Sequence, residues 1–232
     1  MEQMRILVIS DVHGNLTALE EVLRDAGRSD LVICSGDIVG YGPNPCECLD
    51  VLRGLKIRQV SGNHDRAAVA GIKFKENTTA GRALQVHSDL LGPGHKDFLK
   101  KLPKSLKFNV GGIEMAVFHG SPRKPFREYV YQADAEIYVD EFLRMSGAEL
   151  MILGHTHIPY VVRSGNGLIV NPGSVGQPRD GDPRASYTLI DIEKGEIEVT
   201  NCRVGYDIDL VTSRIKEMGL PTSLVSRLYL GL

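Results

Sequence analysis

The stretch Leu31–Asp37, with the sequence LVICSGD, decides the fold. It is an apolar run too short for a helix, and it ends in small residues followed by a carboxylate. A buried parallel strand delivers a functional group to its carboxyl end in this way. The stretch therefore predicts a strand of an α/β sheet, with Asp37 placed where ligands bind.

Four further apolar runs end in the same way. Each stops at polar residues that can bind a metal or move a proton: Asp11 and His13 after 5–10, Asn63, His64 and Asp65 after 57–61, His119 after 115–118, and His155 and His157 after 150–153. In an open α/β sheet, ligands bind beyond the carboxyl ends of the strands. We therefore expect these five strand ends to converge on one site.

Length and composition exclude several classes of protein. At 232 residues and 42% hydrophobic, the chain fits one globular domain over residues 1–232. The formal net charge of -2 gives no reason to expect a nucleic-acid partner. The apolar start is too short for a signal peptide or a membrane span. The four cysteines include no Cys-x-x-Cys pair, so we expect free thiols and a cytoplasmic protein.

The order of elements suggests a βαβ opening followed by an insertion. Helices over 77–91 and 95–102 interrupt the alternation, so we interpret residues 77–102 as a helical insert near the site. Four short strands, at 160–163, 168–170, 185–191 and 196–203, suggest an antiparallel second sheet. Helices over 207–218 and 221–230 close the chain.

The polar residues at the strand ends are too many for a single ion. A catalytic zinc-like site uses about three protein ligands, and seven are present: Asp11, His13, Asp37, Asn63, His119, His155 and His157. Two ions fit if one carboxylate bridges them, and such a pair clamps the attacking and leaving oxygens of a phosphoryl group. Imidazole and oxygen ligands without thiolate favour manganese, with iron, zinc, nickel or cobalt as alternatives.

His64 remains outside this ligand count. It is free to act as the acid that protonates the leaving oxygen, with Asp65 as a possible orienting partner. A lone His-x-His pair is more often structural than metal-binding, but five of the seven histidines fall at predicted strand ends. His87 and His95 lie in the insert, so we assign them structural roles.

Arg123 and Arg179 are candidate substrate-binding residues. Arg123, Lys124 and Arg127 follow a predicted strand end, and Arg179 follows a glycine-rich turn. They could hold a substrate phosphate or form a solvated basic loop. The turn at 171–176 could bring backbone amides to the site or only connect two strands.

The polar residues form five blocks that resemble the signature of the calcineurin-like metallophosphoesterases: Asp11-x-His13, Gly36-Asp37, Gly62-Asn63-His64-Asp65, His119 and Gly154-His155-x-His157. The short chain and the turn at 40–45 are similar to the small prokaryotic phosphodiesterase branch of that superfamily. The resemblance implies a four-layered αββα sandwich. It also implies two metal sites that share a carboxylate and a catalytic His64: one site of Asp11, His13, Asp37 and His157, the other of Asp37, Asn63, His119 and His155.

The leading hypothesis is a dinuclear metal-dependent phosphodiesterase acting on a small-molecule phosphoester. A metal-bridging hydroxide would attack phosphorus in line, and His64 would assist the leaving group. The alternatives are a phosphomonoesterase acting on a nucleotide or phosphoprotein, a nuclease, and a non-catalytic metal-binding scaffold. The sequence leaves the oligomeric state open. A scaffold would be expected to have lost ligands, and all seven are present.

Overall fold

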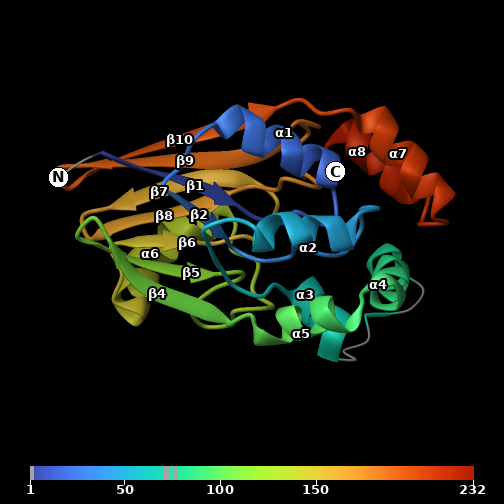
Figure 1. The fold of residues 1–232 in the computed structure, drawn as a ribbon. Helices are drawn as coiled ribbons and strands as arrows, with labels where there is room; N and C mark the ends of the chain where they lie inside the picture. Colours follow the sequence, from blue (N-terminus) through green and yellow to red (C-terminus); the bar gives the residue numbers. More distant parts are fainter. Residues whose placement is uncertain (1–2, 71–73, 76–77) are drawn as a thin grey trace.

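Two five-stranded sheets pack face to face between layers of helices (Figure 1). The computed structural model describes residues 3–70, 74–75 and 78–232. The two sheets and their outer helices form the predicted αββα sandwich. Within the described ranges, no helix is long and apolar enough to cross a membrane.

The first sheet has the strand order β10-β9-β1-β2-β3. Its strands are β1 (Met4–Ile9), β2 (Leu31–Cys34), β3 (Ile57–Gln59), β9 (Ala185–Glu193) and β10 (Glu196–Val204). The first three are parallel, with Ile6 paired to Leu31, and β9 runs antiparallel beside β1. The parallel strands therefore end at one edge, as the opening stretch predicts.

The second sheet has the strand order β4-β5-β6-β8-β7. Its strands are β4 (Ser105–Val110), β5 (Ile113–Phe118), β6 (Leu150–Ile152), β7 (Pro159–Ser164) and β8 (Gly167–Pro172). β5, β6 and β8 are parallel. The predicted antiparallel second sheet is wrong, because β9 and β10 join the first sheet whereas β7 and β8 join the second.

Alternation along β1 explains the layers. Ile6 and Val8 face the second sheet and pack with Met115 and other apolar residues of its strands. Leu7 and Ile9 point the other way, against the helices α1 (Leu16–Ala26) and α2 (Pro45–Arg53). The helix α6 (Gln132–Ser146) covers the outer face of the second sheet. The central parallel strands of each sheet are thus covered on both faces, as is usual for parallel strands.

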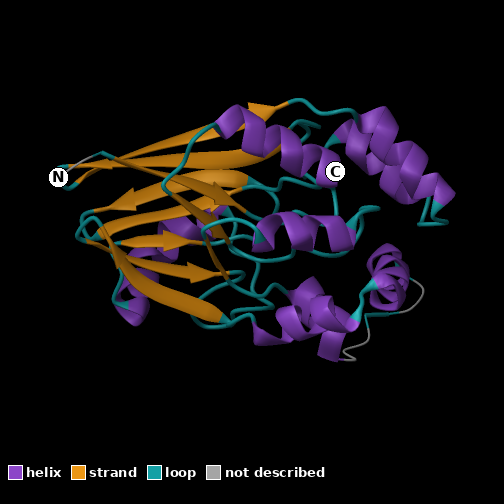
Figure 2. Ribbon diagram, viewed as in Figure 1, coloured by secondary structure: helices purple, strands orange, loops and turns teal. Residues whose placement is uncertain are grey.

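The other described helices lie at the end of the sandwich toward which the parallel strands point (Figure 2). They are α3 (Asn63–Ala70), α4 (Thr79–Leu90), α5 (Pro93–Lys101), α7 (Ile208–Glu217) and α8 (Ser223–Leu230). The predicted start of the insert at residue 77 lies outside the described residues. Helix α3 and strand β4 were not predicted, although Leu106, Phe108 and Val110 alternate as in a strand with one buried face.

Candidate metal centre

The carboxyl ends of five strands bring the predicted ligands together. Two sets of three side chains each have ligand atoms within 4.8 Å of one another. We call Asp11, His13 and His157 the first metal group, and Asp37, His119 and His155 the second metal group. Each group combines residues from distant parts of the chain, such as Asp11 with His157, so the fold assembles each site.

The first metal group is compact and buried. The Nε2 atoms of His13 and His157 lie 3.1 Å apart. Asp11 Oδ1 lies 3.2 Å from His157 Nε2 and 3.6 Å from His13 Nε2. This oxygen is buried and has no hydrogen-bond partner among the described residues. The three side chains therefore point their lone pairs at one place.

The second metal group has the same arrangement with one more ligand. His119 Nε2 lies 3.0 Å from His155 Nδ1 and 3.3 Å from Asp37 Oδ2. The side-chain oxygen of Asn63, the first residue of α3, lies 2.9 Å from the same His119 nitrogen. All four predicted ligands of this site are thus brought together.

Asp37 lies between the two groups. Its Oδ2 is 3.3 Å from His119 Nε2 in the second group and 3.9 Å from His13 Nε2 in the first. The other oxygen, Oδ1, accepts a hydrogen bond from the backbone N–H of His64 at 2.8 Å. Asp37 is the carboxylate that could bridge two ions, in the place where the sequence analysis put it.

These residues fit divalent metal ions. A metal–nitrogen distance of about 2.0 to 2.1 Å separates neighbouring ligand atoms by about 3.0 to 3.4 Å, close to most of the distances above. Three imidazoles also have their other nitrogen next to a buried backbone carbonyl: His13 Nδ1 at Val39, His119 Nδ1 at Ser35, and His157 Nδ1 at Gln177. A carbonyl only accepts, so each Nδ1 carries the proton and each Nε2 offers its lone pair inward.

Backbone strain is concentrated at the ligands. Five of them have positive φ: Asp11 (51°), His13 (49°), Asp37 (55°), His155 (70°) and His157 (61°). The left-handed region costs a residue with a side chain about 1 to 2 kcal/mol, and such strain gathers at functional sites. Hydrogen bonds between the ligand loops hold this conformation, as from Asp11 N to Gly36 O and from His13 N to Asp37 O.

The electrostatics of the site favour bound cations. Burial raises the pKa of Asp37, but the imidazoles of His119 and His64 outweigh it, so that the pKa is below its ordinary value. The pKa of Asp11 is likewise below its ordinary value, because the His157 imidazole beside it outweighs the effect of burial. Burial lowers the pKa of His119, yet the Asp37 carboxylate raises it to about 9. The buried carboxylates thus keep their charge and attract positive charge, which metal ions supply.

Asp65 supports the Asp37 loop instead of orienting His64. Its carboxylate accepts four backbone N–H groups at 2.9 to 3.1 Å, those of Asp37, Ile38, Val39 and Gly62. In the part of the chain that the structure describes, it makes no hydrogen bond to His64, so the expected orienting contact is wrong. The two residues are successive on α3, and neighbouring side chains of a helix point in different directions.

His64 lies beside the first metal group. Its ring centroid is 4.9 Å from that of His13, 4.7 Å from Tyr41 and 4.9 Å from Phe74. The ring is buried against Gly40, where an added Cβ would come within 2.4 Å of His64 Nδ1. His64 is therefore held rigidly next to both groups, and its catalytic role stays a prediction.

The two arginines predicted to bind substrate are placed differently. Arg123 Nη2 lies 2.8 Å from a carboxylate oxygen of Glu128, and its guanidinium covers Phe142 at 4.8 Å. Its charge is already paired, so it does not support phosphate binding. Arg179 Nη2 donates to the Tyr41 hydroxyl at 3.3 Å, and its backbone N–H donates to His157 O. Arg179 therefore does reach the site.

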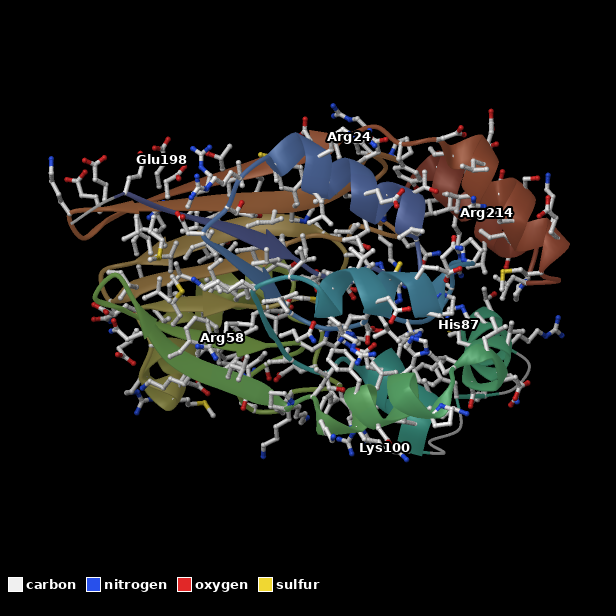
Figure 3. The ribbon with its side chains drawn as sticks, in the orientation of Figure 1. Arg24, Arg58, His87, Lys100, Glu198 and Arg214 are labelled. Carbon is white, nitrogen blue, oxygen red and sulfur yellow. The ribbon has the colours of Figure 1, made fainter. Side chains whose placement is uncertain are left out.

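His87 has a structural role close to the centre, on α4 (Figure 3). Its Nδ1 accepts the Gly40 N–H at 2.8 Å and its Nε2 donates to Gly42 O at 2.7 Å. Burial lowers its pKa to about 4, so the ring is neutral. It fixes the loop that carries Tyr41. His95 lies elsewhere, 3.1 Å from Asp50.

The turn at 171–176 holds the ligand loops in place. The side-chain nitrogen of Asn171 donates to Gly154 O at 2.9 Å and to Thr156 Oγ1 at 3.0 Å. The Ser174 hydroxyl donates to Asp11 O at 2.7 Å. The segment thus does more than connect two strands, because its polar groups link the loops that carry ligands of both groups.

A cleft of about 530 Å³ opens beside the second metal group, and we call it the aromatic cleft. Asn63 and His155 line one end, and the rest is lined by Arg66 of α3, by Phe74 and by the 124–129 loop. Lys124 and Arg127 are among the residues weighed from the sequence as phosphate-binding, whereas Arg66, Phe126 and Tyr129 were not predicted. Their segments are about 60 residues apart, and no local pattern joins them.

Comparisons with known proteins identify the family of this chain. The model of the calcineurin-like phosphoesterase superfamily domain matches residues 4–195. Uncharacterized protein MJ0912 of Methanocaldococcus jannaschii is 36% identical over 100% of both chains. Phosphodiesterase YfcE of Escherichia coli is 25% identical over 81% of this chain and 88% of its own. The crystal structure of a metallophosphoesterase from Sphaerobacter thermophilus is 40% identical, covers 100% of both chains and has a TM-score of 0.85. The chain therefore belongs to the calcineurin-like phosphoesterase superfamily.

Proposed function

We propose that the protein is a dinuclear metal-dependent phosphodiesterase that hydrolyses a small-molecule phosphoester. The position of Asp37 carries this proposal, because its Oδ2 lies within 3.9 Å of a ligand nitrogen in each metal group. A shared carboxylate is what two adjacent ions require. The similarity to a protein named phosphodiesterase favours a diester over a monoester.

The residues of the site have separate roles in the proposed reaction. The first metal group with Asp37 would hold one ion, and the second metal group with Asn63 would hold the other. Bound divalent ions lower the pKa of a bound water to about 7 and stabilise developing negative charge on phosphate. The imidazole and oxygen ligands favour manganese. Arg179, next to Tyr41, adds a positive charge that would orient the phosphate.

We infer that His64 acts on the leaving oxygen. Its ring is locked between Tyr41 and Phe74 and adjoins His13, so it borders the centre without being part of either ligand set. A positioned histidine that transfers a proton contributes about 10² to 10⁴ in rate.

The free, buried thiols of Cys34 and Cys48 support the cytoplasm as the working compartment.

Hydrolysis of an aryl phosphodiester and of the matching monoester tests the proposal. Chelated protein is reloaded separately with manganese, nickel, zinc and magnesium, and we expect diester cleavage only after reloading. His64→Ala should lose this turnover, whereas His95→Ala, at a partly buried site beside Asp50 on another part of the molecule, should retain it. No turnover by protein that binds two ions would contradict the proposal, and faster monoester cleavage would replace it with a phosphomonoesterase.

A further inference from the structure

The aromatic cleft is continuous with the second metal group. Asn63 and His155 form part of its wall, so a molecule in the cleft would touch ligands of that group. Its volume of about 530 Å³ lies within the usual range for small-molecule sites. A phosphoester bound at the metal centre would therefore extend one of its substituents into this space.

Positive charge lines the cleft beyond the metal groups. Arg66, Lys124 and Arg127 are exposed at its wall, and the described lining residues include no carboxylate. Within the described ranges, Lys124 and Arg127 have no ion-pair partner, in contrast to Arg123, which is paired with Glu128. Metal ions would already neutralise the scissile phosphate. The additional cations therefore favour a ligand with a second phosphate.

Aromatic rings line the same cleft. The Arg66 guanidinium lies 4.4 Å from the ring centroid of Phe126, which is half-buried. Tyr129 stacks on His155 with 3.8 Å between centroids and stays 47% exposed. Planar aromatic groups bind such side chains by stacking. Every nucleobase has a planar face, so this stacking does not depend on which base is bound.

From these two properties together, we propose that the aromatic cleft binds a nucleotide. The base packs against Phe126 and Tyr129, and a phosphate next to the scissile phosphoester binds Lys124 and Arg127. The substrate class is thus a nucleotide ester with more than one phosphate. This inference rests on the proposed function, because it assumes that the scissile phosphate binds at the metal groups.

Equilibrium binding tests the inference separately from turnover. ADP, AMP, adenosine and pyrophosphate are titrated into the metal-loaded protein and into the chelated protein. ADP should bind at least ten-fold tighter than adenosine or pyrophosphate in both forms, because stacking and charge act together. Lys124→Gln combined with Arg127→Gln should weaken ADP more than AMP and should reduce the dependence on salt.

A matched pair of variants isolates the aromatic contribution. Phe126→Leu should weaken the binding of ADP about ten-fold, because base–aromatic stacking is lost, and should leave the affinity for pyrophosphate unchanged. Phe108 is a second phenylalanine below an arginine, with the Arg58 guanidinium 5.7 Å from its ring. Phe108 and Arg58 line a different hollow, which shares no residue with the aromatic cleft. Phe108→Leu should therefore leave ADP binding unchanged.

Each result assigns failure to one proposal. ADP binding without any turnover would contradict the phosphodiesterase and leave the nucleotide cleft intact. Turnover of the aryl diester without ADP binding would overturn the nucleotide cleft alone. ADP that binds no tighter than pyrophosphate, or that is insensitive to Phe126→Leu, would show a simple anion site. A hexanucleotide that binds tighter than ADP would assign the cleft to nucleic acid and also overturn the inference.

Discussion

The two metal groups offer similar ligands but have different surroundings. Asp11, His13 and His157 are at most 2% exposed, and the backbone carbonyls of Val39 and Gln177 fix the two imidazoles from behind. In the second group, His155 and its neighbour Asn63 form a wall of the aromatic cleft. His155 Nε2 is buried without a hydrogen-bond partner among the described residues, and the outer face of its ring stacks on Tyr129, which is 47% exposed.

This difference suggests a division of labour. The first group is enclosed by loops that hydrogen-bond to one another, so we expect it to hold its ion tightly and to exchange it slowly. The second group faces the cleft, so we expect its ion to exchange faster and to meet the substrate. The predictions below test whether the groups are separable, beginning with the residue that joins them.

Asp37→Asn should have the largest effect because it removes the charge shared by both groups. We expect hydrolysis of the aryl diester to fall by about 10³-fold or more, as loss of metal stabilisation amounts to several kcal/mol. Metal content per chain and turnover are measured on the same sample. Asp50→Asn is the control, since the Asp50 side chain is 62% exposed. Two bound ions with an unchanged rate would show that the groups do not depend on Asp37.

Asp65→Asn should destabilise the loop on which both groups depend. Its carboxylate accepts four backbone N–H groups, and an amide offers one oxygen and two donors, so some of these buried donors lose their acceptor. We expect the free energy of unfolding in urea to fall by about 3 kcal/mol. Asp30→Asn, where the exposed carboxylate accepts from Arg5 N at 2.9 Å, should change it much less. An equal effect of the two substitutions would contradict this role for Asp65.

The ligands could be predicted from the sequence because each follows an apolar run directly. A short buried strand and the polar residues at its end form one local pattern, as at Asp37 and His119. The helices α1 and α2 were also predictable from local sequence, because residues at or next to their first turns mark where they begin. Asn15 accepts from Ala18 N as the N-cap of α1, and Pro45 opens α2.

The remaining features depend on contacts between distant segments. Strand β9 carries the same pattern in either sheet, and only pairing with β1 decides where it lies. Arg123 and Arg127 are four residues apart in one basic loop, yet within the described residues only Arg123 pairs with carboxylates, those of Glu128 in the same loop and of Glu141 on α6. Sequence alone therefore identifies which residues are reactive and leaves open which of them face the substrate.

The pH dependence of the free energy of unfolding tests the structural role of His87, which holds the loop that carries Tyr41. Burial lowers its pKa to about 4 in the folded protein, whereas the ordinary value is about 6.5. Below pH 6.5, His87 is protonated in the unfolded chain but stays neutral in the folded protein. The contribution of neutral His87 to the free energy of unfolding is therefore complete above pH 6.5 and is lost as the pH falls. At pH 5 the loss is about 2 kcal/mol. His87→Gln should remove this part of the pH dependence in urea unfolding, and His95→Gln should not. An unchanged slope in His87→Gln would contradict a neutral His87.

Tyr129→Ala should have the smallest and most selective effect. The lost stacking on His155 is worth about 1 kcal/mol, which corresponds to about five-fold in affinity for the ion of the second group. Calorimetric titration of manganese into chelated protein measures both binding steps. Tyr131→Ala is the control, because Tyr131 is also 47% exposed but lies 6.3 Å from Tyr129 and does not stack on His155. A five-fold loss confined to the weaker step would place that ion at the cleft. Equal losses in both steps would mean that the two ions bind as one unit through Asp37, and the proposed division between an enclosed and an open group would then be wrong.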